Sequence, residues 1–196
     1  MMARDWDVYG ALASALTYPG AGFEAAIDES LGALDGVDEA ARKGFECWAE
    51  RMREMSPEER EEVYSRTFDL SPKCTLELGW HLFGESYDRG TFLVWMRDKL
   101  SGFSLEETTD LPDHVRHVLP VLGRLRLADA DKFSRACVLP AMETIREGLK
   151  GMDSPYESLL DTICDWLESR HGASIRDTGS LPILSQHEEL LRAEGI

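Results

Sequence analysis

The residues best suited to chemistry lie close together around position 113. Asp113, His114 and His117 combine a carboxylate with two imidazoles, and Asp110 precedes them. Both groups are common ligands of zinc and other transition metals, and residues three apart share a helical face. A metal-dependent helical enzyme that uses Asp113, His114 and His117 is therefore one hypothesis. No His-Glu-x-x-His motif or second ligand pair accompanies them, and surface histidines at a helix start are far commoner. We assign no metal, no cofactor and no catalytic residue.

Other catalytic signatures are also missing from the sequence. It has no phosphate-binding loop, no dinucleotide fingerprint and no nucleophile elbow. The four cysteines are widely spaced and form no Cys-x-x-Cys pair, which is typical of buried free thiols in a reducing compartment. No basic region followed by an apolar run opens the sequence, and no stretch is apolar enough to span a bilayer. We therefore expect a soluble, cytoplasmic protein that does not insert into the membrane.

The charge of the chain bears on its partners. The 196 residues carry a formal net charge of −16, which argues against a nucleic-acid partner because phosphate contacts need clustered lysine and arginine. Long-range attraction would favour a cationic partner, and this attraction would weaken with salt. The alternative is that the charge only maintains solubility.

Aromatic residues gather in the middle of the sequence. Taken singly, most of them are expected in the core, but together they are also typical of a groove that receives the apolar face of a peptide. The aromatics are Tyr64, Phe68, Trp80, Phe83, Tyr87 and Trp95, and an acidic rim could come from Glu77, Glu85, Asp88 and Asp113. An ordinary solvated acidic surface is the competing interpretation.

The elements that must position these residues are helices. Apolar residues recur at spacings of three and four along most of the chain, for example over 6–16, 89–100 and 129–149. Ser56-Pro57-Glu58-Glu59 has the pattern of a capped helix start, Pro112-Asp113 is expected to open another helix, and Pro120 and Pro140 are expected to bend theirs. We predict an all-α, single-domain helical bundle of about seven or eight helices over residues 1–171. Residues 172–196 are expected to form a flexible or loosely docked tail.

Several short motifs occur in order through the central block. They are Tyr64 with Thr67-Phe68-Asp69, His81, Gly84-Glu85-Ser86, Arg89-Gly90, Leu111-Pro112-Asp113-His114 and Leu119-Pro120. In this combination the chain resembles the NarJ-type branch of the TorD/DmsD family, the cytoplasmic chaperones that assemble molybdenum enzymes. The resemblance extends over roughly residues 6 to 170.

The resemblance implies a fold and a task. The fold is a single all-helical chaperone domain of the TorD/NarJ type. The task is to bind the N-terminal segment of a molybdoenzyme catalytic subunit until the molybdenum cofactor is inserted, before membrane attachment or export. The client would be the nitrate reductase catalytic (alpha) subunit, or a related dimethyl sulfoxide, selenate, chlorate or perchlorate reductase. A helical scaffold without such a client is a further alternative.

The resemblance also suggests a binding site. Asp113 and His114 are expected to bind the client or to hold the shape of its groove, and the imidazole could make affinity depend on pH. The full set of expected groove residues is Tyr64, Phe68, Trp80, His81, Glu85, Arg89, Asp113 and His114. The chain is expected to be a monomer, or a dimer that exchanges helices through a hinge at residues 101–110.

Overall fold

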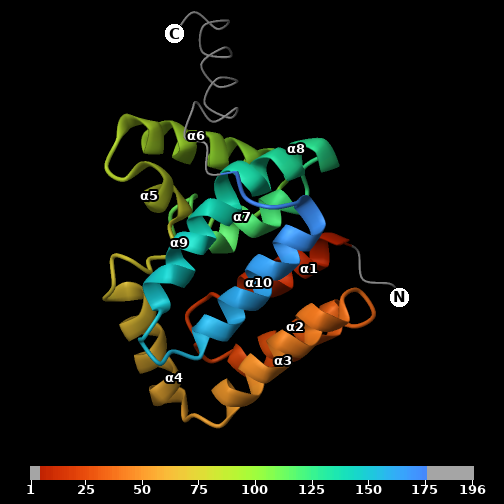
Figure 1. Cartoon of the computed structure of the whole chain (residues 1–196), viewed down its shortest axis with the longest axis vertical. Coiled ribbons are helices and arrows are strands. Elements are labelled where there is room, and N and C mark those ends of the chain that lie inside the picture. Colours follow the sequence, from red (N-terminus) through yellow and green to blue (C-terminus); the bar gives the residue numbers. More distant parts are fainter. Residues whose placement is uncertain (1–4, 176–196) are drawn as a thin grey trace, which may run out of the picture.

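The structure, a computed structural model, describes residues 5–175 and is helical throughout (Figure 1). Within this range there are nine continuous helical segments and no strand, which confirms the all-α prediction and slightly exceeds the expected number of helices. Two segments are composite, because π-helical turns extend α4 and connect α8 to α9. The elements are α1 (Asp5–Ser14), α2 (Phe23–Leu34), α3 (Glu39–Arg53), α4 (Pro57–Tyr64), η1 (Ser65–Asp69), α5 (Leu78–Phe83), α6 (Tyr87–Gly102), α7 (Val115–Leu122), α8 (Leu127–Phe133), η2 (Ser134–Val138), α9 (Leu139–Leu149) and α10 (Tyr156–His171).

The helices surround one apolar core. Helix α10 crosses the middle of the molecule and packs against α3 on one side and α9 on the other (Figure 1). Helix α1 packs against α2 and α7, and α5 packs against α6 and α9. Phe45, Trp48 and Tyr156 are fully buried where α3 meets α10. The core therefore extends through the whole bundle, as expected for a single domain.

The start of α4 confirms the capping pattern read from the sequence. The Ser56 hydroxyl accepts a hydrogen bond from the Glu59 N–H at 3.2 Å, and the Glu59 carboxylate accepts from the Ser56 N–H at 2.8 Å. Pro57 occupies the first turn, where its missing N–H leaves no bond unmade. These local contacts determine where α4 begins. They therefore also help to determine where α4 ends at Tyr64 and η1 begins.

The two π-helical turns are features that periodicity did not predict. At η1 the Leu70 N–H donates to the Ser65 carbonyl at 3.0 Å, a bond that spans five residues. At η2 the π-turn ends at Val138, two residues before Pro140, so Pro140 lies in the first turn of α9 within the continuous segment from α8 to α9. The expected disturbance at Pro140 therefore takes the form of a change in helix type. π-Turns are rare and frequently lie at functional sites.

The predicted tail is described only at its beginning. Residues 172–175 lie against η2, where the Ile175 N–H donates to the Arg135 carbonyl at 2.8 Å and Arg135 Nε donates to the Ala173 carbonyl at 3.0 Å. The rest of the tail, 176–196, lies outside the described residues, so its flexibility stays a prediction. The exchange of helices through residues 101–110 also stays a prediction.

The cysteine thiols follow the expectation with one exception. Cys74, Cys137 and Cys164 are buried and free, and burial raises the pKa of the Cys137 and Cys164 thiols to about 12. Cys47 is also free, but it is exposed on α3, so the prediction of a buried thiol was wrong there. Within residues 5–175, no helix is both long enough and apolar enough to cross a membrane.

Candidate binding site

The segment around Asp113 pairs with residues 76–78 through backbone hydrogen bonds and does not begin a helix. The Leu78 N–H donates to the Asp113 carbonyl at 2.9 Å, and the Val115 N–H donates to the Leu76 carbonyl at 2.9 Å. Because these backbone groups bond across to residues 76–78, α7 begins at Val115. The expectation that the helix opens at Pro112 and Asp113 was therefore wrong. The antiparallel bridge fixes His114 opposite Glu77.

Asp113 forms a buried ion pair beneath this bridge. Its carboxylate is fully buried, and Arg89 Nε of α6 donates to it at 3.0 Å. Burial raises the pKa of the Asp113 carboxyl, and the Arg89 guanidinium opposes that shift. The same guanidinium lies 5.7 Å from the centre of the Trp80 ring. Gly79 leaves the space for this arrangement, because a Cβ there would lie 2.5 Å from an Asp113 carboxylate oxygen.

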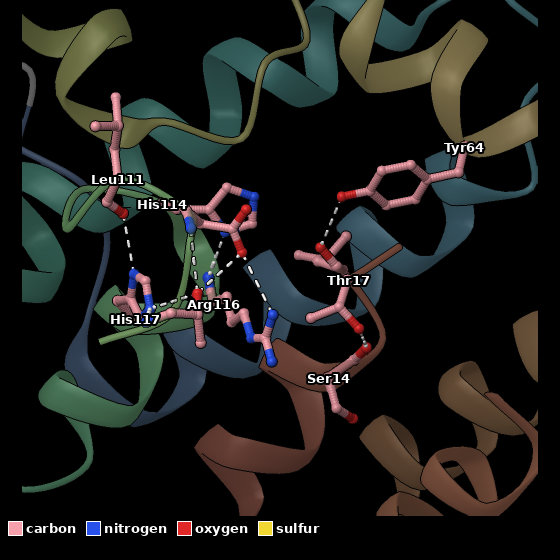
Figure 2. Close-up of polar contacts among 10 residues, drawn as sticks. Ser14, Thr17, Tyr64, Leu111, His114, Arg116 and His117 are labelled. Carbon is pink, nitrogen blue, oxygen red and sulfur yellow. Dashed lines mark hydrogen bonds and ion pairs between the residues drawn. The ribbon is translucent and has the colours of Figure 1, made fainter. Parts of the chain in front are cut away.

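The two histidines point to different partners (Figure 2). His114 Nδ1 accepts from the Arg116 N–H at 3.1 Å and so caps α7. His117 Nδ1 lies 2.9 Å from the Leu111 carbonyl, and its Nε2 accepts from the Thr108 N–H at 3.2 Å, which ties the 101–110 loop to α7. Burial lowers the pKa of His114 to about 4, so this imidazole is neutral at pH 7.

This geometry does not favour the metal hypothesis. Both nitrogens of His117 have backbone hydrogen-bond partners, and Asp113 is ion-paired with Arg89. Across residues 5–175, no three histidine, cysteine, aspartate or glutamate side chains converge in a way that could hold a metal ion. The polar groups around position 113 instead organise the bridge and the start of α7.

A pocket of about 250 Å³ opens beside His114, and we call it the acidic pocket. Its lining comes from the end of α4, from η1, from the connection to α5 and from the residue before α7, and consists of Tyr64, Phe68, Asp69, Thr75, Leu76, Glu77 and His114. Glu77 is half-buried, and desolvation raises the pKa of its carboxyl. The Thr75 hydroxyl donates to this carboxylate. The pocket thus combines two aromatic rings, two carboxylates and one imidazole.

A second hollow of about 740 Å³ lies between α5 and α9, and we call it the α5–α9 pocket. Its lining is mainly polar and consists of Lys73, Trp80, His81, Glu143, Thr144, Glu147, Gly148 and Lys150. His81 Nε2 lies 2.7 Å from the Thr75 carbonyl, and burial lowers the pKa of His81. Thr75 therefore connects the walls of the two pockets.

The eight residues expected from the sequence do not line one continuous groove. Tyr64, Phe68 and His114 meet at the acidic pocket, whereas Trp80 and His81 line the α5–α9 pocket. The Arg89–Asp113 ion pair lies beside Trp80, below the bridge. Glu85 is exposed beyond the end of α5 and lines neither pocket.

The aromatic residues of the acidic pocket also belong to the core. The ring centres of Tyr64 and Phe68 lie 5.1 Å apart, and each ring contacts Tyr156. The Tyr64 hydroxyl donates to the Leu16 carbonyl at 3.4 Å (Figure 2). The expectation that most central aromatics are core residues is confirmed for Tyr64, Phe68 and Trp95, whereas Tyr87 is 88% exposed. The aromatic wall of the pocket is therefore continuous with the hydrophobic core.

Asp69 and Thr75 are pocket residues that sequence reasoning did not single out. Asp69 is part of the Phe68-Asp69 motif, which was a visible signal, but its position depends on the π-turn η1. Thr75 carries no signal of its own, because its role arises from contacts with Glu77 and His81.

Residues 5–175 thus form an all-helical fold with recessed pockets on its surface. Residues 28–160, about two thirds of the chain, match the family model described as "Nitrate reductase delta subunit", and the chain belongs to this family. Two similar proteins are the nitrate reductase molybdenum cofactor assembly chaperones NarJ of Escherichia coli strains K12 and O157:H7. Each is 28% identical over 110 residues, which is 56% of this chain and 46% of the relative. The chain thus spans about half the length of the curated relatives that it matches.

Proposed function

We propose that this protein is a cytoplasmic, non-enzymatic chaperone that supports insertion of the molybdenum cofactor into the catalytic subunit of a respiratory molybdoenzyme. It would bind the N-terminal segment of that subunit, with the nitrate reductase alpha subunit as the first candidate client. The observation that carries the proposal is the family match over residues 28–160, together with relatives named as nitrate reductase assembly chaperones.

The chemistry of the surface supports a peptide partner. The net charge of −16 would attract a basic segment over a distance, while apolar contacts in recessed pockets would determine how long it stays bound. The residues proposed to contact the client or to shape its site are Tyr64, Phe68, Trp80, His81, Glu85, Arg89, Asp113 and His114. Among these, Asp113 is fully buried and acts through Arg89, so its role is to hold the site in shape.

The client could also be a related dimethyl sulfoxide, selenate, chlorate or perchlorate reductase. A set of synthetic peptides that reproduce the N-termini of these catalytic subunits distinguishes them. Each peptide is titrated calorimetrically into the full chain, with a scrambled peptide of the same composition as control.

We expect saturable binding to one N-terminal peptide, and loss of binding when the apolar residues of that peptide are replaced by serine. The affinity should fall as salt is raised, because attraction between exposed charges is screened. Equal affinity for the true and scrambled sequences, or no heat of binding with any peptide, would overturn the proposal.

A further inference from the structure

We propose that the acidic pocket holds one cationic side chain, an arginine or a lysine, of the bound partner segment, with Glu77 and Asp69 as its counter-ions. In the same complex His114 Nε2–H donates a hydrogen bond to a backbone carbonyl next to that side chain. The inference rests on the proposed function for the identity of the partner, but the pocket itself can be tested with a small probe.

The pocket concentrates negative charge, and none of its lining residues is a lysine or an arginine. Burial raises the pKa of the Tyr64 hydroxyl, and the negative charges of Asp69, Asp110 and Glu77 raise it further, whereas the positive charge of Arg116 opposes the shift. Asp110 is compensated by Arg116, whose Nη1 lies 3.4 Å from its carboxylate. Within the described part of the chain, no lysine or arginine forms an ion pair with Asp69 or Glu77. A cation from a partner would therefore neutralise the carboxylates of Asp69 and Glu77.

His114 provides a second, independent feature that points into the pocket. Its side chain is 94% buried, since the residue is only 6% exposed, and it lines the pocket. Because Nδ1 accepts from the Arg116 N–H, the neutral ring carries its proton on Nε2. Nε2 has no hydrogen-bond partner among residues 5–175, and Figure 2 shows this nitrogen turned toward the side on which Tyr64 lies. A donor in this position suits a carbonyl oxygen of the partner.

The neutrality of His114 fits a cationic ligand. A protonated imidazole in the wall would repel an ammonium or guanidinium group in the pocket, but burial keeps this ring uncharged at pH 7. The rings of Tyr64 and Phe68 offer faces or edges to the same space, and cations are attracted to the faces of aromatic rings. The volume of about 250 Å³ is below the range usual for drug-sized ligands, which favours a single side chain over a whole cofactor.

The first test uses a probe that needs no client. Nα-acetyl-arginine N-methylamide carries one guanidinium between two peptide groups, and the citrulline analogue has the same shape without the charge. Both are titrated into the full chain while the amide and side-chain signals of the acidic pocket are followed by NMR. We expect saturable shifts with the arginine compound and about tenfold weaker binding of the citrulline compound.

Matched variants distinguish a direct contact in the pocket from attraction by the overall negative charge of the protein. Glu77→Gln removes one negative charge in the pocket and keeps a group that can accept from Thr75. Glu62→Gln removes the same charge from an exposed position on α4 outside the pocket. We expect Glu77→Gln to weaken binding of the arginine compound about tenfold and Glu62→Gln to change it by less than about twofold. Asp69→Asn, at an exposed residue, provides a second pocket variant.

The same variants are then titrated with the client peptide and with peptides in which each arginine is replaced by citrulline and each lysine by acetyl-lysine. One replacement should reproduce the loss seen with Glu77→Gln. If the client peptide binds and every replacement leaves its affinity unchanged, the pocket inference is wrong while the proposed function stands. If no client peptide binds, the proposed function fails, and the arginine probe alone decides the inference. Equal binding of the arginine and citrulline probes would overturn it.

Discussion

Two glycine-to-alanine substitutions test the close packing under Asp113. Gly79 lies in α5 and Gly90 lies in α6, and in both helices alanine is intrinsically favoured over glycine by roughly 0.5–1 kcal/mol. At Gly90 a new Cβ would have no neighbour within 4 Å. At Gly79 it would lie 2.5 Å from an Asp113 carboxylate oxygen and 3.0 Å from Phe92. Asp113 cannot move away easily, because Arg89 and the backbone bridge hold it.

The two variants should therefore change stability in opposite directions. Overpacking of a well-packed core costs roughly 1–3 kcal/mol, which exceeds the gain in helix propensity. We expect Gly79→Ala to lower the free energy of unfolding by about 1–2 kcal/mol and Gly90→Ala to raise it by about 0.5–1 kcal/mol. Urea denaturation followed by circular dichroism measures both, provided the slope of unfolding free energy against urea is unchanged. If Gly79→Ala is as stabilising as Gly90→Ala, the described contact between α5 and Asp113 is incorrect.

Three further substitutions follow from the site and the helix caps. Burial lowers the pKa of His114 from 6.5 to about 4, so between these pH values the unfolded chain binds a proton that the folded chain does not. Up to about 3 kcal/mol of stability should therefore be lost as the pH falls from 6.5 to about 4. The raised pKa values of Glu77 and Asp113 change stability with pH in the opposite direction. The test therefore compares wild type with His114→Gln in urea titrations at pH 7 and pH 5. An identical pH dependence of the two proteins would contradict the buried neutral imidazole. Arg89→Ala leaves the Asp113 carboxylate buried without its cation and should lower the free energy of unfolding by about 3 kcal/mol at pH 7. Adding Asp113→Asn should restore most of this loss. A double variant no more stable than Arg89→Ala would refute the proposed cost of the unpaired carboxylate. Ser56→Ala should cost about 1 kcal/mol in the same titration, and no measurable loss would show that the cap contributes little.

Local signals in the sequence were sufficient to predict the helical architecture. Apolar spacings of three and four arise because one face of each helix must be buried, so the stripe along α10 is visible before any contact is known. The start of α4 depends only on Ser56, Pro57 and Glu59, which are neighbours in the chain. For features of this kind the physical cause lies within one or two helical turns.

Features that depend on distant residues could not be predicted in this way. Asp113 was expected at a helix start because of its neighbours, but its backbone bonds to Leu78, 35 positions earlier, and its side chain bonds to Arg89. The acidic pocket combines η1, the connection to α5 and the residue before α7, so its composition follows from tertiary packing. For the same reason Trp80 and Tyr64, which are close in sequence, line different pockets.

The central claim, that the protein supports cofactor insertion, is tested most directly by the molybdenum content of the client. The nitrate reductase catalytic subunit is purified from cells that lack this protein and from the same cells complemented with it, and molybdenum is measured per mole of subunit. We predict a subunit that is present but poor in molybdenum without the protein, and restored content with the wild-type chain. Equal molybdenum content in the two preparations would contradict a role in assembly of this enzyme.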